Sequence, residues 1–174
     1  DRAYLSERLR EKKYSYSEDE LKRYFELSDV LKGMFELTGF LFNVQVEELL
    51  GESKPSVWHS DVRVFAVSKD GVKVAHFYFD PFVRNGLKRG GAWMNEFGNR
   101  SDRLKQKPLA VMVLNLPQPD ADGKCLMPIR EVETLFHEFG HALQCMLTEV
   151  MIRLLQSVYT APAAHASGPV KQNY

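Results

Sequence analysis

Hydrophobic residues recur along the chain with two different periods. In 1–14 and 17–42 they are spaced three or four positions apart, which predicts helices. In 61–79 they follow the alternation of strands, interrupted by Asp70-Gly71, and this predicts a β-hairpin. A run in 109–116 is apolar on both faces, as in a strand that is covered on both sides. The pattern therefore predicts a helical N-terminal part followed by a small sheet.

The clearest amphipathic pattern lies in 128–148. At about 100° per residue, its apolar side chains gather on one side of a helix and its polar ones on the other. Pro128 suits the first helical position, where a backbone N–H has no partner in any case. We therefore predict a helix whose apolar side packs on the core. That side holds Val132, Leu135, Phe136, Phe139, Leu143, Met146 and Leu147, and the polar side holds Glu133, Thr134, His137, His141, Gln144 and Thr148.

The polar side of this helix carries the pattern His-Glu-x-x-His. His137 and His141 are four residues apart, so their imidazoles lie one turn apart on one face and can bind one zinc ion together. Glu138 lies beside them and can accept a proton from a metal-bound water. The alternative is a surface helix on which two histidines are four residues apart by chance. We favour a zinc site with His137 and His141 as metal ligands and Glu138 as the catalytic residue.

The composition is that of a globular protein without a strongly charged surface. The 174 residues suffice for one domain, and 23 basic residues balance 23 acidic ones. A formal net charge of zero gives no global attraction to nucleic acid or to an anionic membrane. No apolar run is long enough to span a bilayer, and the first residues, which do not begin with Met, lack the features of a signal peptide. We therefore expect no nucleic-acid partner and no membrane partner.

The two cysteines are Cys125 and Cys145. One disulfide between them is the alternative to two free thiols, which we favour because free thiols are usual in an intracellular protein. Cys145 stands one turn beyond His141, where a thiolate could bind the metal. A small residue that lines the helix is the favoured alternative.

The segment 80–103 is rich in Gly and Arg. Basic residues of this kind occur in phosphate and RNA sites, but a single Arg-Gly-Gly is not a repeat, and the whole chain is neutral. We favour a structured loop at the rim of a cleft over a nucleic-acid site.

Four stretches resemble one known family, the thimet oligopeptidase and oligopeptidase A family of zinc metallopeptidases. The strongest is TLFHEFGHALQ, preceded by HFYFDPFVRNGLKRGGAWMNE. The stretches YLSERLREKKYSYSEDELKRYF and VWHSDVRVFAV are also similar to that family. The resemblance covers about residues 1–147. HEFGHALQ together with the upstream GGAW is much more specific than His-Glu-x-x-His alone.

The resemblance implies a mainly α protein with a small antiparallel β-sheet beside the active site, and a zincin-like catalytic region that is incomplete in this chain. It implies one Zn²⁺ ion, bound by His137, His141 and a third ligand, with Glu138 polarising the attacking water. It also implies that the substrates are short peptides. Their backbone would lie along the strand at Leu114-Asn115-Leu116, in the manner of an added strand.

The third zinc ligand is unknown. In the family it is a glutamate on a later helix, and the resemblance ends before that helix. After residue 149 the sequence contains no Asp or Glu. Glu149 lies eight residues beyond the second histidine, about 12 Å along a straight helix, too far to bind the same ion. Glu133, one turn before His137, and His165, in the tail, are poor substitutes.

Family members are several times longer than 174 residues. We therefore interpret the chain as truncated, with a partial metallopeptidase catalytic domain in 1–148 and a divergent tail in 149–174. The partial domain would hold helices in 1–50, strands in about 61–116 and the zinc helix in 128–148. We expect impaired cleavage of short peptides, self-association through exposed apolar surface, and an intracellular location in the cytoplasm or in an organelle (mitochondrion or plastid). A non-catalytic fragment that binds peptides or a partner is the alternative.

Overall fold

The computed structural model describes residues 18–148, apart from Asn85, Arg89 and Asp102. The helix predicted for 1–14 and the tail in 149–174 lie outside these residues. Within the described part the chain forms a five-stranded sheet and three α-helices. In chain order the elements are α2 (Glu18–Lys22), α3 (Leu27–Phe42), β1 (Val44–Glu48), the short 3-10 helix η1 (Gly51–Ser53), β2 (Arg63–Lys69), β3 (Val72–Phe82), β4 (Trp93–Gly98), β5 (Leu109–Leu116) and α4 (Ile129–Leu147).

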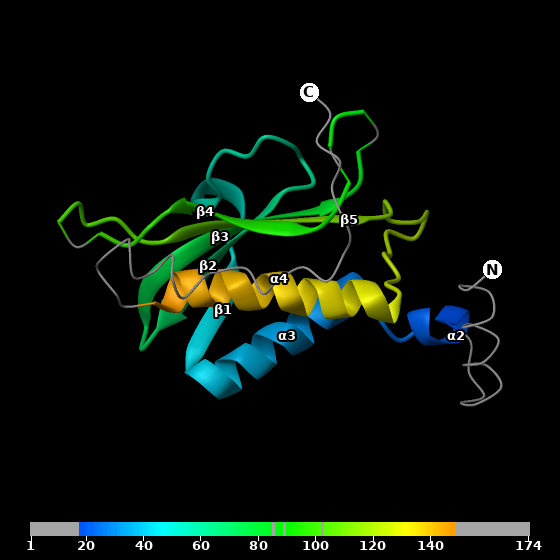
Figure 1. Cartoon of the computed structure of the whole chain (residues 1–174), viewed down its shortest axis with the longest axis horizontal. Coiled ribbons are helices and arrows are strands. Elements are labelled where there is room, and N and C mark those ends of the chain that lie inside the picture. Colours follow the sequence, from blue (N-terminus) through cyan, green and yellow to red (C-terminus); the bar gives the residue numbers. More distant parts are fainter. Residues whose placement is uncertain (1–17, 85, 89, 102, 149–174) are drawn as a thin grey trace, which may run out of the picture.

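The strands lie in the order β1-β2-β3-β5-β4 (Figure 1). The first three form an antiparallel meander, in which Lys69 pairs with Val72 across the β2–β3 turn. The chain then passes to the outer strand β4 before β5 enters between β3 and β4. As a result, β5 is antiparallel to β4 but parallel to β3, where His76 pairs with Leu109. Among the described strands, β1 and β4 are therefore the two edges of the sheet.

The prediction of a mainly α fold with a small antiparallel sheet is wrong, because the sheet is larger and mixed. Two of its strands were missed. Asn43 adopts a left-handed conformation (φ 54°) that ends α3 and turns the chain into β1, inside the part for which helices were expected. β4 lies in the Gly- and Arg-rich segment that was interpreted as a loop. The parallel pairing of β3 with β5 follows from strand order, which alternation along the chain does not reveal.

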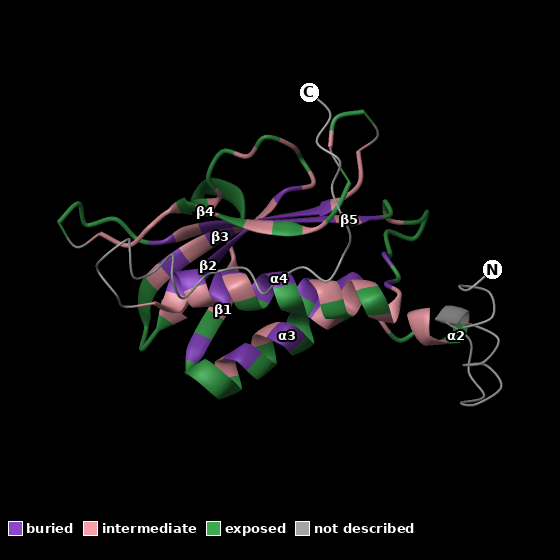
Figure 2. Cartoon of the chain, in the orientation of Figure 1, coloured by how far each residue is buried: buried purple, intermediate pink, exposed green. Residues whose placement is uncertain are grey.

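Both long helices pack on the same face of the sheet (Figures 1 and 2). The ring of Phe35 on α3 links them to the strands, because its centroid lies 5.2 Å from Phe65 on β2 and 5.7 Å from Phe139 on α4. Phe77 on β3 stacks on Phe65 at 4.9 Å and contacts Phe139 at 5.6 Å. These rings form the centre of one continuous core. The helix that carries the two histidines is thus fastened to the middle of the sheet.

More large apolar side chains are exposed on α3 than on α4. Most of the apolar side of α4 is covered, with Leu135 and Met146 buried, but Phe136, predicted to pack on the core, is exposed. By contrast, Leu37, Phe40 and Leu41 on the outer side of α3 are exposed, Phe40 by 86%. Self-association stays a prediction, and the surface that it would use is that of α3. No helix in the described range is long and apolar enough to cross a bilayer.

Replacing two glycines by alanine should change the free energy of unfolding in opposite directions. Asp70 (φ 51°) and Gly71 (φ 75°) form the two-residue turn between β2 and β3, and Gly71→Ala should destabilise the protein by about 1–2 kcal/mol because an L side chain is strained at this φ. Gly33 lies inside α3 with open space around it, so Gly33→Ala should stabilise by about 0.5–1 kcal/mol. Urea unfolding of both variants measures the difference. Equal effects would contradict these backbone assignments.

Candidate metal centre

The two histidines of the motif lie together on α4. The helix begins after Pro128 and ends before Thr148, and its buried residues are apolar except for Glu138. The Nε2 atoms of His137 and His141 are 3.1 Å apart, and their ring centroids are 4.7 Å apart. His137 is exposed and His141 is half-buried. The helix therefore brings two imidazole nitrogens to one point at its surface.

This separation suits one shared metal ion. Two nitrogens bound to a tetrahedral zinc at about 2.0–2.1 Å lie about 3.3 Å apart. The observed Nε2 to Nε2 distance of 3.1 Å is close to that value, so both atoms can approach one ion with little movement. Imidazole nitrogen is also among the ligands that zinc prefers. The two histidines are therefore suitable as two ligands of one zinc ion.

Glu138 lies beside His137 and is a buried residue of α4. It is only 8% exposed, and it lines a pocket of about 590 Å³ together with His137. The pocket is also lined by Ala92, which comes directly before β4. A carboxylate, an imidazole and the start of an edge strand therefore share one hollow. Arg130, Glu133 and Thr134 of α4 complete its lining.

No third ligand is found in the part of the chain that the structure describes. There, no three His, Cys, Asp or Glu side chains form a group that could hold a metal ion. Glu133 shares the pocket with His137 but does not complete such a group. Glu149 and His165, the other residues considered, lie outside the described range.

The structure disfavours Cys145 as a thiolate ligand. Cys145 is fully buried on the sheet-facing side of α4. The pKa of its thiol is raised to about 12, mainly by burial and further by the nearby carboxylate of Glu96 on β4, which repels the thiolate and hydrogen-bonds to the thiol. The thiol is therefore protonated at neutral pH. The interpretation of Cys145 as a small residue lining the helix fits this environment.

The strand predicted to bind substrate occupies the interior of the sheet. Leu114 and Leu116 are fully buried, and neither belongs to the lining of the pocket. Asn115 is half-buried, and its side-chain amide donates a hydrogen bond to the carbonyl of Gly91. This segment therefore supports the stretch that leads into β4. Burial alternates along Trp93–Gly98 in the structure, but apolar and polar residues do not alternate in its sequence, so no strand pattern marked β4.

Two basic residues of the segment 80–103, Arg84 and Lys88, take part in a buried ion-pair cluster. Asp80, only 3% exposed, accepts two hydrogen bonds from Arg84 at 2.9 and 2.6 Å. It also accepts bonds from Lys88 at 3.1 Å and from the indole of Trp58 at 3.0 Å. Burial alone would raise the pKa of Asp80, but the hydrogen bonds from Arg84, Trp58 and Lys88 outweigh it and lower the pKa. Arg84 and Lys88 are thus committed to Asp80, which argues against a phosphate site there.

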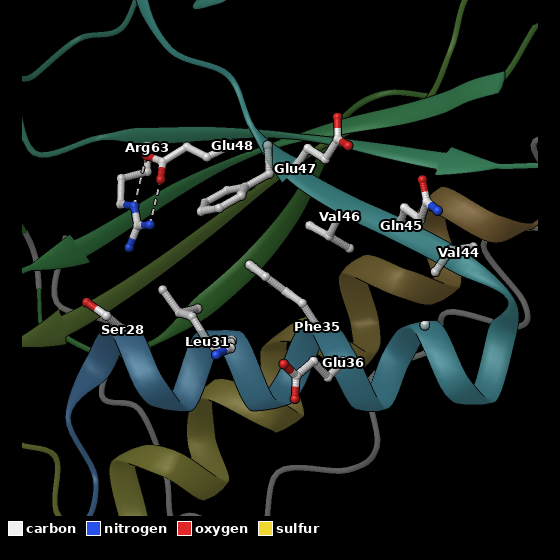
Figure 3. A pocket seen from close by; sticks show the side chains of 13 residues that line it. Ser28, Leu31, Phe35, Glu36, Val44, Gln45, Val46, Glu47, Glu48 and Arg63 are labelled. Carbon is white, nitrogen blue, oxygen red and sulfur yellow. Dashed lines mark hydrogen bonds and ion pairs between the residues drawn. The ribbon is translucent and has the colours of Figure 1, made fainter. Parts of the chain in front are cut away.

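A second hollow lies between α3 and β1 (Figure 3). It measures about 640 Å³ and is lined by apolar side chains such as Phe35 together with charged ones such as Glu36. At its edge, Arg63 and Glu48 form an ion pair at 2.6 Å. Because Arg63 and Glu48 are paired with each other, we assign no binding or catalytic role to this hollow.

Comparisons with known proteins find similar proteins among the oligopeptidases. Organellar oligopeptidase A, chloroplastic/mitochondrial, of Arabidopsis thaliana is 48% identical over 156 residues, which are 86% of this chain and 20% of that protein. Probable cytosolic oligopeptidase A of the same plant is 47% identical over 156 residues, covering 86% and 22%. Oligopeptidase A of Escherichia coli (strain K12) is 36% identical over 154 residues, also covering 86% and 22%. The chain spans about a fifth of the length of these curated relatives.

The model of one protein family also matches, over residues 1–163. That match covers most of the chain and includes the strands, the pocket and the two histidines. It confirms the resemblance to the thimet oligopeptidase and oligopeptidase A family. The chain therefore belongs to peptidase family M3.

Proposed function

We propose that this chain supplies the zinc-binding helix and the adjoining edge strand of a metalloendopeptidase that cleaves short peptides. One observation carries the proposal. The Nε2 atoms of His137 and His141 are 3.1 Å apart, and the buried carboxylate of Glu138 shares a pocket with His137. Two metal ligands and a proton acceptor are the parts of such a site that one helix can provide. The names of the relatives, which are oligopeptidases, support the same class of substrate.

In this proposal each residue of α4 has one role. His137 and His141 would hold one zinc ion through Nε2. Zinc, when bound, supplies a Lewis acid and lowers the pKa of water to about 7. The carboxylate of Glu138 accepts the proton of the attacking water and later gives it to the leaving amine. The partly enclosed position of Glu138 keeps the carboxylate close to the reacting peptide and away from bulk water.

The edge strand β4 is the better candidate for binding the peptide backbone. A peptide can add to a sheet only where a strand has free backbone groups. In the described part, β5 is paired on both sides, with β3 and with β4, whereas β4 pairs only with β5. Ala92, directly before β4, also lines the pocket of Glu138. We therefore assign the role first predicted for Leu114-Asn115-Leu116 to the start of β4.

A catalytic zinc usually has three protein ligands and a water. The described residues provide two, so the third would come from outside them. The alternative function, a fragment that binds peptides without cleaving them, rests on this same observation. We further propose an intracellular location in the cytoplasm or an organelle, for which the names of the two Arabidopsis thaliana relatives offer both precedents.

Glu138→Gln separates catalysis from metal binding. The amide has nearly the size of the carboxylate but cannot accept the proton. We expect slow zinc-dependent cleavage of a quenched fluorescent peptide by the wild-type chain, and a rate about 100-fold lower in the variant. Zinc affinity should be unchanged, because Glu138 is not a ligand in this proposal. Equal zinc-dependent rates in the two proteins would remove Glu138 from the mechanism, and peptide binding without cleavage in either protein would favour the alternative function.

A further inference from the structure

We propose that the buried cluster of Asp80, Arg84 and Lys88 is a positioning element that holds the start of β4 against α4, and so sets where a bound peptide lies relative to Glu138. The inference rests on the proposed function, in which the peptide pairs with β4. None of the three residues is part of the pocket lining. They would act through the backbone that they hold in place.

Lys88 is the central tether of this cluster. Its side chain is only 7% exposed. Its ammonium group donates to the carboxylate of Asp80 at 3.1 Å, to the backbone carbonyl of Asp80 at 2.9 Å and to that of Phe82 at 2.8 Å. These three bonds use all three N–H donors of the ammonium group. The loop after β3 is therefore folded back and fastened to the last residues of that strand.

The tether lies close to the candidate metal centre along the chain. Lys88 stands four positions before Ala92, which lines the pocket of His137 and Glu138. Between them, the carbonyl of Gly91 accepts a hydrogen bond from the side chain of Asn115 on β5. The connection into β4 is thus anchored at one end by the cluster and near the other end by Asn115. Two anchors this close leave the backbone at Ala92 little freedom to move away from α4.

Stability alone does not account for such a cluster. The cost of removing charges from water offsets most of the attraction in a buried ion pair. Apolar side chains of similar size in the same place often make the folded protein equally stable or more stable. A fixed set of charge-assisted hydrogen bonds differs from an apolar contact in its geometry, because it is satisfied in one arrangement of the loop. Arg84 holds the carboxylate by two bonds, which fixes its orientation toward Lys88.

The test compares Lys88→Met with Arg63→Met in the whole chain. Lys88→Met removes the tether but leaves Asp80 paired with Arg84. Arg63→Met removes an ion pair that is also partly buried, with Glu48, but at the α3–β1 hollow away from β4 (Figure 3). Asn115→Ala loosens the other anchor and serves as a second variant if Lys88→Met folds poorly. Three quantities are measured in each protein: amide hydrogen exchange in 86–98, zinc affinity, and affinity for a short fluorescein-labelled peptide in the presence of Zn²⁺.

We expect Lys88→Met and Asn115→Ala to speed exchange in 86–98 and to weaken peptide binding by about 10- to 100-fold, the usual scale for misplacing a binding element. Zinc affinity should stay at the wild-type value in both, and Arg63→Met should alter none of the three quantities. Unchanged exchange in both anchor variants, or equal changes in Arg63→Met, would overturn the inference. If the wild-type chain binds zinc but no peptide, the proposed function fails, and the exchange data alone still decide whether the cluster holds β4.

Discussion

Replacing either His137 or His141 by alanine should lower the zinc affinity of the chain by more than about 100-fold, beyond the loss typical of an outer-shell partner of a metal site. Each substitution removes one of two nitrogens that lie 3.1 Å apart on α4. A single imidazole cannot chelate, so the remaining histidine should bind zinc no better than an ordinary surface histidine. Competition with a zinc indicator dye measures the affinity.

The matched control is His76→Ala. His76 lies on β3, away from the pocket lining, and its loss should leave the zinc affinity unchanged. The double variant of His137 and His141 should be no weaker than the single variants by more than a few-fold, because the first loss already destroys chelation. Wild-type affinity in either single variant would show that zinc binds elsewhere or not at all.

Phe77→Ala should lower the free energy of unfolding by about 3–5 kcal/mol, the range for a large buried side chain truncated in a packed core. Phe77 is fully buried, stacks on Phe65 and contacts the rings of Phe35 and Phe139. It therefore joins β3 to both helices at once. Because Phe139 lies between the two histidines on α4, the same change should also loosen the helix that carries the site.

Phe40→Ala is the control for this substitution. The side chain of Phe40 is 86% exposed on α3, so its loss should change the free energy of unfolding by no more than about 0.5 kcal/mol. Urea unfolding followed by circular dichroism measures both variants. A cost for Phe77→Ala as small as that for Phe40→Ala would mean that the aromatic core does not hold the helices on the sheet.

The elements that could be predicted from the sequence are those specified by local pattern. The helical period of 128–148 matches α4 to within one residue at each end, and the Asp70-Gly71 turn matches the two-residue link between β2 and β3. The sheet as a whole could not be predicted in this way. The position of β5 between β3 and β4 depends on contacts between residues far apart in the sequence, and period-2 alternation carries no information about which strands are neighbours.

In the candidate site, too, the features set by local spacing could be predicted and those set by contacts between distant residues could not. The spacing of His137 and His141 on one helix was sufficient to predict that their nitrogens meet, although zinc binding itself stays a prediction. That Glu138 and Ala92 line the same pocket could not be predicted from the sequence, because it depends on β4 being the edge strand beside α4. The sequence likewise gave no indication that Arg84 and Lys88 share a buried partner, Asp80.

The central claim is that His137 and His141 bind one zinc ion together. X-ray absorption at the zinc edge, on the chain loaded with one equivalent of zinc, tests this claim most directly. It should detect imidazole nitrogens at about 2.0–2.1 Å, two in the wild type and one in either alanine variant. A spectrum without imidazole scattering in the wild type, or the same spectrum in the wild type and in the double variant, would contradict the claim.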